Sequence, residues 1–167
     1  MRTYFFLRSA IVGTICLVLA TLDTAQTSNP SQKEAPVTHA TGPFDVKMTP
    51  QDDKSTEGVS RMLIDKQYHG DLEGAAKGQM LTNGVDAKGS GVYVAIEKFT
   101  GTLKGRTGTF MLHHTGLMTR GAPQLTITVI PDSGTGELAG ISGKMTINIA
   151  PGGKHSYDFE YTIAKTD

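Results

Sequence analysis

GVYVAIEKFTGTLKGRTGTFMLHHTG, residues 91–116, alternates in the manner of a strand on both sides of a central Lys104-Gly105. A two-residue turn fits there because Gly adopts positive φ without steric cost. That turn places Phe99 opposite Phe110, and a slip of one residue would break this match. We therefore predict an antiparallel hairpin with one shared face, formed by Tyr93, Ala95, Glu97, Phe99, Phe110, Leu112 and His114.

A second hairpin is predicted around Pro151-Gly152-Gly153. A three-residue loop there pairs Ile149 with His155, and two residues further along each strand it pairs Ile147 with Tyr157. One face is then apolar and aromatic, whereas the other carries Thr146, Asn148, Ser156, Asp158, Glu160 and Thr162. Such a pattern is typical of an antiparallel strand pair with one buried and one solvated side.

The phrase Gly-x-Leu-x-Gly occurs three times, at residues 70–74, 101–105 and 136–140, each time between β-rich stretches. We interpret each copy as the turn from one strand into the next. The predicted strands cover residues 44–48, 59–68, 75–82, 91–99, 106–118, 124–130, 143–150 and 154–163. Because closure removes exposed strand edges, the pattern predicts an all-β fold, an eight-stranded antiparallel closed β-barrel.

The first part of the chain has the features of an export signal. Residues 1–20 carry Arg2 and Arg8 around a short aromatic run and then an uncharged apolar stretch, too short to span a bilayer of about 30 Å. Cleavage is expected after Ala20, with a site as late as residue 25 as the alternative. Residues 21–43 are rich in Thr, Ser, Gln and Pro and are predicted to form a disordered tether, followed by the barrel domain at 44–165.

Charge and cysteine content exclude several classes of partner. The chain has 16 Lys and Arg against 16 Asp and Glu, so a nucleic-acid partner is not expected. Loss of the leader would remove Cys16, the only cysteine, and with it any thiol chemistry or disulfide. We expect an exported protein, periplasmic or secreted, that has no membrane contact in its mature form.

Glu97 and His114 are the candidate catalytic residues. They are diagonal neighbours on adjacent strands of the first hairpin, about 7–8 Å apart at Cα, and both point into the barrel. A carboxylate and an imidazole in an apolar cavity can share a proton or orient a ligand. The alternative is structural, in which the two groups satisfy each other within the core.

Five further inward residues are predicted to line a ligand site together with Glu97 and His114: Tyr93, Phe99, Phe110, His155 and Tyr157. Aromatic walls with a few polar groups are typical of small-molecule pockets, although ordinary core packing produces the same pattern. No metal is expected, because adjacent His113 and His114 point to opposite faces of their strand, and no cofactor is expected. Val92, Val94 and Ile96 make the outer face of their strand apolar as well, which allows a homo-oligomer.

Several segments resemble a known family. Gly70-Asp71-Leu72-Glu73-Gly74, Glu97-Lys98-Phe99-Thr100-Gly101, His114-Thr115-Gly116, Lys154-His155-Ser156-Tyr157 and above all residues 133–140, SGTGELAG, match the pattern of the bacterial "domain of unknown function 3224" family. The resemblance runs from about Gly42 to Ile163. It implies a calycin-like eight-stranded barrel with a cavity, similar in fold to plant allene oxide cyclase, and it implies no established activity.

Three functions are compatible with these features. The first is a barrel that binds a small, largely apolar molecule. The alternatives are a cofactor-independent isomerase or cyclase and a structural or assembly protein that uses the apolar outer face. The sequence does not decide whether the protein is an enzyme.

Overall fold

The computed structural model describes residues 36–52 and 56–164, so the predicted leader and most of the predicted tether lie outside the described residues. All described residues belong to one compact unit, Glu34–Asp167. They form nine strands: β1 Thr38–Gln51, β2 Ser60–Tyr68, β3 Leu72–Val85, β4 Gly91–Leu103, β5 Arg106–Thr119, β6 Ala122–Val129, β7 Thr135–Gly136, β8 Ile141–Ile149 and β9 His155–Ile163. Within this part of the chain no helix is long and apolar enough to cross a membrane.

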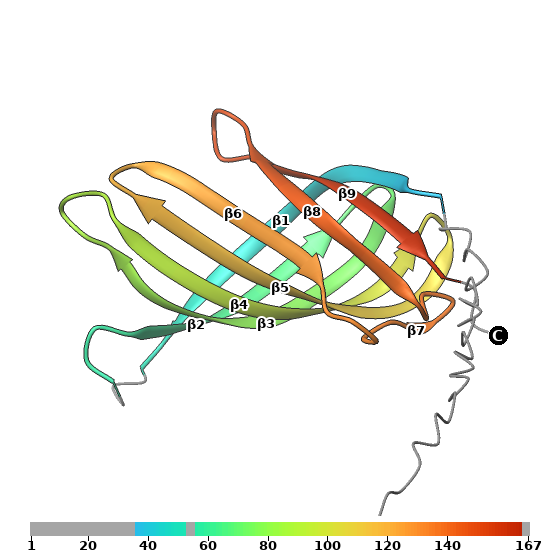
Figure 1. Ribbon diagram of the computed structural model, residues 1–167, viewed down its shortest axis with the longest axis horizontal. Coiled ribbons are helices and arrows are strands. Elements are labelled where there is room, and N and C mark those ends of the chain that lie inside the picture. The colour runs from blue at the N-terminus through green and yellow to red at the C-terminus, as the bar shows by residue number, and fades with distance from the viewer. Residues whose placement is uncertain (1–35, 53–55, 165–167) are drawn as a thin grey trace, which may run out of the picture. The chain divides into compact units, whose positions relative to one another are not determined.

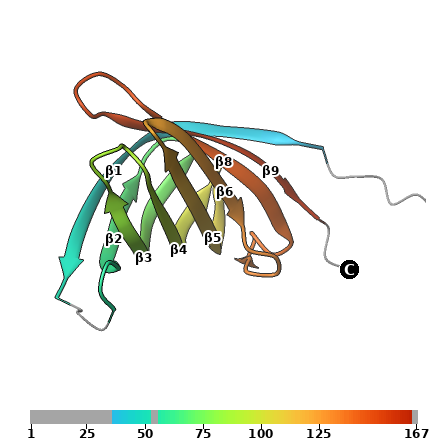
Figure 2. The same ribbon diagram turned by 60° about the vertical axis from the view of Figure 1, so that its left-hand side comes forward.

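Eight of the strands close into an antiparallel barrel, as predicted. Neighbouring strands pair in the order β1–β2–β3–β4–β5–β6–β8–β9, and β9 returns to β1. Figure 2 shows β2 to β6 as one curved wall with β1, β8 and β9 crossing over it. The ninth strand, β7, is a two-residue addition beside the start of β5 and is not among the predicted strands. It is too short to show a period of two.

The predicted start of the barrel at residue 44 is too late. β1 begins at Thr38, and its first part pairs with β9, where Ala40 lies opposite Phe159 and is fully buried. Residues 38–43 fall within the predicted tether because residues 21–43 are rich in Thr, Ser, Gln and Pro and show no hydrophobic period. Proline lacks the N–H that a ladder uses, but Pro43 still contributes its carbonyl, which accepts a hydrogen bond of 3.0 Å from the His69 amide.

Both predicted hairpin registers are confirmed. In β4–β5, Phe99 lies opposite Phe110 and Ala95 opposite His114, and the turn has φ 47° at Lys104 and 81° at Gly105. In β8–β9, Ile147 lies opposite Tyr157. The two positive φ values explain why Gly105 is needed at the second turn position.

The three Gly-x-Leu-x-Gly copies lie at one end of the barrel. They form the β2–β3, β4–β5 and β7–β8 connections, and the leucine of each copy, Leu72, Leu103 or Leu138, is fully buried. We call this the leucine end. A carboxylate holds the β2–β3 turn against β1, since Asp71 accepts a hydrogen bond from the Thr41 amide at 2.9 Å. The repeated phrase therefore serves architecture, as predicted.

The opposite end, which we call the open end, carries the β3–β4, β5–β6 and β8–β9 hairpins. Toward this end β6 and β8 separate (Figure 1), and their ladder consists of the single pair Thr128 and Lys144. Inward residues here are less covered than those deeper in the barrel: Leu125 is 45% exposed and Ile149 is 65% exposed. The barrel is thus closed at the leucine end, whereas at the open end β6 and β8 are joined by few ladder hydrogen bonds. We call this weakly paired junction the β6–β8 seam.

Candidate functional site

A charged cluster lies inside the barrel. Lys66 from β2, Glu97 from β4 and His114 from β5 are 5%, 0% and 4% exposed. Each occupies an inward position of its strand, because side chains on a strand alternate between the two faces. Glu97 and His114 therefore come together as predicted, and the structure adds a buried lysine to them.

Glu97 is the centre of the cluster. Lys66 Nζ donates a hydrogen bond to Glu97 Oε1 at 3.0 Å and lies 2.9 Å from Oε2. The Tyr68 hydroxyl donates to Oε1 at 3.1 Å, and His114 Nε2 lies 3.3 Å from the same oxygen. Lys66 Nζ also lies 5.2 Å from the centroid of the Phe44 ring, within the range of a cation–π interaction.

The surroundings keep Glu97 ionised. Burial alone would raise the pKa of the carboxyl, but the interactions with His114 and Lys66 outweigh it and lower the pKa to about 2. Burial and the negative charge of Glu97 raise the pKa of Tyr68 well above its ordinary value. At neutral pH Glu97 is therefore a fixed negative charge and a weak base.

Two atoms of the cluster keep unused hydrogen-bonding capacity. Within the described part of the chain, Glu97 Oε2 and His114 Nε2 are buried and make no hydrogen bond. The short distances from Oε2 to Lys66 and from Nε2 to Glu97 are ion-pair contacts that lack hydrogen-bond alignment. Because buried polar groups are nearly always hydrogen-bonded, these two atoms are the places where a water or a ligand group would find a partner.

An apolar cavity of about 340 Å³ lies at the open end. Tyr93, Met118 and Leu125 contribute to its lining from three different strands, and Ile149 contributes from β8. Gly116, opposite Tyr93 in the ladder, leaves room for the tyrosine ring, because a Cβ at Gly116 would lie 2.0 Å from Tyr93 Cε1. Tyr93 shares the inward face of β4 with Glu97, four residues further along the strand, and burial and the negative charge of Glu97 raise the pKa of Tyr93.

The remaining predicted ligand residues lie elsewhere. Phe99 and Phe110 are fully buried with ring centroids 5.0 Å apart, and Phe110 stacks on Phe159 at 5.6 Å. The Tyr157 hydroxyl donates to the His69 carbonyl at 3.0 Å and accepts from the Leu72 amide at 2.7 Å.

His155 is half-buried against Phe44, with ring centroids 5.1 Å apart. Of the seven predicted residues, Tyr93 lines the open-end cavity, while Glu97 and His114 form the cluster.

Lys66 is not among the site residues predicted from the sequence. A signal was present, because Ile64, Lys66 and Tyr68 occupy alternate positions of one predicted strand and so share a face. Lysine is almost never fully buried unless it is paired, so a lysine at this position is normally expected to face solvent.

The two adjacent histidines point to opposite faces, as predicted: His114 is buried and His113 is exposed, with its Nε2 2.6 Å from Thr128 Oγ1. Within residues 36–52 and 56–164, no group of three His, Cys, Asp or Glu side chains is placed to hold a metal ion.

The fold and the site together define an all-β barrel with a buried Lys–Glu–His cluster and an apolar cavity at one end. The model of the family described as "Protein of unknown function (DUF3224)" matches residues 40–161, and the chain belongs to this family. A crystal structure of a DUF3224 protein of unknown function from Shewanella oneidensis MR-1 is similar, with 44% identity and a TM-score of 0.73. The match covers 78% of this chain and 100% of that one. A search of curated proteins found no match.

Proposed function

We propose that the barrel binds a small, largely apolar molecule in the open-end cavity. The observation that carries this proposal is the apolar lining of that cavity, which has a volume of about 340 Å³. Small-molecule sites are concave and mostly apolar, with a few polar groups that fix orientation. The aromatic rings predicted as the binding surface pack on one another, with centroids 5.0 and 5.6 Å apart, so we propose the open end rather than the barrel centre for the ligand.

The charged cluster supports a defined orientation for the ligand. Tyr93 lines the cavity and shares the inward face of β4 with Glu97, so a polar group of the ligand would be directed toward this side. Glu97 Oε2, although 2.9 Å from Lys66 Nζ, and His114 Nε2 make no aligned hydrogen bond, so a polar group of the ligand could bond to either atom. A molecule with an apolar body and one hydroxyl or carbonyl group fits these features.

A fluorescent apolar probe, N-phenyl-1-naphthylamine, tests the proposal. We expect saturable binding with one site per chain. Ile149→Glu should weaken it about tenfold or more, because an unpaired charge in the cavity must be desolvated when the probe binds. Val37→Glu is the matched control, since Val37 is also 65% exposed and lies in the chain just before β1, which begins at the leucine end. Equal affinity in the two variants, or no saturable binding, would overturn the proposal.

A second candidate function is a cofactor-independent isomerase or cyclase, favoured by the two buried atoms without hydrogen bonds. In that reaction His114 would exchange the proton, because a carboxylate with a pKa of about 2 is a poor base at neutral pH. Glu97 would hold the imidazole in position. His114→Gln, with an unchanged circular dichroism spectrum, should then abolish turnover of a bound substrate; turnover that persists in this variant would exclude the role.

The leader predicted at residues 1–20 supports export as the setting of either function. Expression of the full chain in a Gram-negative host, followed by fractionation, tests this. We expect recovery from the periplasm or the medium with a new N-terminus after Ala20 or near residue 25, and uncleaved cytoplasmic protein would contradict it.

A further inference from the structure

The β6–β8 seam leaves backbone groups of both strands without a ladder partner. Its ladder is the single pair Thr128 and Lys144, although β6 begins at Ala122 and β8 continues to Ile149. Every other pair of neighbouring strands in the barrel shares at least seven ladder pairs. The seam is therefore the place in the barrel wall where strand pairing is incomplete.

The direction of the free backbone groups in β6 follows from its pairing with β5. In an antiparallel pair, every second residue bonds the same neighbour. The Ile130 amide donates to the Met111 carbonyl of β5 at 2.8 Å, so Gln124 and Thr126 bond β5 as well. The N–H and C=O of Leu125, which lies between them, are therefore directed into the seam.

The same alternation applies to β8. The Ala150 amide donates to the Lys154 carbonyl at 2.9 Å, so Asn148 bonds β9, while the backbone groups of Ile147 and Ile149 are directed toward β6. In the part of the chain that the structure describes, no ladder pairs these groups across the seam. Both edges of the seam thus offer the hydrogen bonds that a further strand would use.

The side chains at the seam match the alternation of a strand. Leu125 and Ile149 lie on the inward side and line the open-end cavity from the two edges. Gln124 and Asn148 occupy outward positions and are polar but uncharged. Residues 122–127 carry none of the charged side chains that commonly protect a free edge from pairing. A strand with apolar residues facing inward and polar residues facing outward would continue this pattern.

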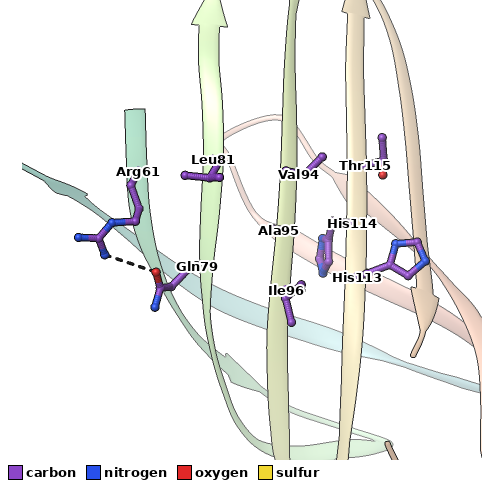
Figure 3. A pocket seen from close by; sticks show the side chains of 9 residues that line it. All are labelled: Arg61, Gln79, Leu81, Val94, Ala95, Ile96, His113, His114 and Thr115. Carbon is purple, nitrogen blue, oxygen red and sulfur yellow. Dashed lines mark hydrogen bonds between the residues drawn. The ribbon is translucent and has the colours of Figure 1, made fainter. Parts of the chain in front are cut away.

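The outer wall has a larger hollow than the open-end cavity but offers no free edge. This depression of about 480 Å³ has a lining that includes Leu81, Val94 and Ile96 (Figure 3). Each strand from β2 to β5 has a hydrogen-bonded neighbour on both sides, so a partner there could only pack side chains against it. The hollow selects no class of partner, whereas free strand edges select an extended peptide, whose own N–H and C=O groups repeat along its length.

We propose that an extended peptide segment with alternating apolar and polar residues adds as a strand in the β6–β8 seam. Its backbone bonds Leu125 on one edge and Ile147 and Ile149 on the other, and its apolar side chains face the open-end cavity. Because the two edges are antiparallel to each other, the segment runs antiparallel to one and parallel to the other. This inference goes beyond the proposed function, because it rests on the backbone edges of the seam.

Hydrogen exchange by NMR tests strand addition on the full chain expressed in an exporting host, with acetyl-Lys-Val-Thr-Val-Thr-Val-Lys-amide as the probe peptide. In the free protein the Leu125 amide should exchange quickly. Saturating peptide should slow the exchange of the Leu125, Ile147 and Ile149 amides about tenfold or more, because each gains a hydrogen bond. The same peptide N-methylated at its five central residues is the matched control. It keeps the side chains, lacks the central N–H groups and should protect none of these amides.

Two variants separate the backbone of the seam from its side chains. Leu125→Ala shortens the side chain and keeps the N–H. Leu125→Pro also removes the N–H that faces the seam, while Gln124 and Thr126 can still bond β5. We expect Leu125→Pro to bind the peptide about tenfold or more weakly than Leu125→Ala, with circular dichroism spectra close to wild type for both.

Equal peptide affinity in the two variants would overturn the proposal, and so would binding that leaves the Leu125 amide unprotected or no saturable binding at all. Protection of this amide without peptide would show that the seam is already closed or filled, which also overturns it. Shift changes confined to Leu81, Val94 and Ile96 would place the peptide on the outer wall instead. Saturable binding of N-phenyl-1-naphthylamine without peptide binding would overturn strand addition alone and leave the proposed function standing.

Discussion

At the residue scale, the pairing of Lys66 with Glu97 is the interaction whose loss should destabilise the fold most. Both side chains are buried, and each depends on the other to compensate its lost hydration. A buried ion pair adds little net stability over an apolar pair, but removal of one partner strands the other charge. Neither charged residue can therefore be replaced alone without a large loss of stability, even though the pair adds little to the net free energy of unfolding.

Glu97→Gln should lower the free energy of unfolding by about 3–5 kcal/mol, because it leaves Lys66 as an uncompensated buried charge. Lys66→Met should lower the free energy of unfolding by a similar amount, because it leaves the Glu97 carboxylate without its cation. The double variant should recover much of the loss, since neither charge remains. Urea denaturation of the four proteins measures this coupling, and additive losses in the double variant would show that the two charges do not depend on each other.

Acid should weaken the fold through the same carboxyl. The pKa of Glu97 is about 2 in the folded protein against an ordinary value of 4.5. A lowered folded-state pKa gives stability that is complete above the unfolded value and is lost as the pH falls toward 2. The contribution is about 3 kcal/mol at neutral pH, at about 1.4 kcal/mol per pKa unit.

Urea denaturation at a series of pH values from 6 down to 2 checks this expectation. The difference in unfolding free energy between wild type and Glu97→Gln should shrink as the pH falls through this window, because the wild-type carboxyl becomes neutral as well. A difference that stays constant with pH would mean that the ionised form of Glu97 is not the stabilising one.

At the scale of the elements, the hairpins were the most predictable part. Turn chemistry at Lys104-Gly105 together with the match of Phe99 and Phe110 determines the β4–β5 register, because a one-residue slip reverses every side chain. The first part of β1 was not predictable in this way. Its pairing with β9 is non-local, and proline at position 43 resembles a linker unless the partner strand is known.

The β6–β8 seam should be the most dynamic part of the wall. Between Ala122 and Ile127, β6 pairs with β5 on one side, while its ladder with β8 is limited to Thr128 and Lys144. Every second amide of that stretch should therefore exchange with solvent quickly. In β4, which has ladders on both sides, amides should exchange only through global unfolding.

Residue-resolved hydrogen exchange by NMR tests this contrast. Uniform protection of β6 at the level of β4 would show that the seam is closed in solution and that the loosening of the barrel at its open end is not a property of the free protein.

At the scale of the whole molecule, the barrel has two different ends. Leu72, Leu103 and Leu138 seal one end, and the other keeps an apolar cavity beside the separating strands. The sequence predicted closure and the inward direction of Glu97 and His114. Strand alternation alone cannot show whether an interior is hollow, since that depends on the summed volumes of side chains from all eight strands. Strand alternation predicted inward aromatic residues that could line a ligand site. In the structure the rings of Phe99, Phe110 and Phe159 pack on one another there instead.

Methyl NMR of the protein titrated with N-phenyl-1-naphthylamine tests the central claim, binding at the open end, most directly. We predict saturable shift changes at the methyl groups of Leu125 and Ile149, with those of Leu72, Leu103 and Leu138 unchanged. Shift changes confined to Val94 and Ile96 would place the probe on the outer wall instead. That result, or a titration without saturable changes at Leu125 and Ile149, would contradict the account.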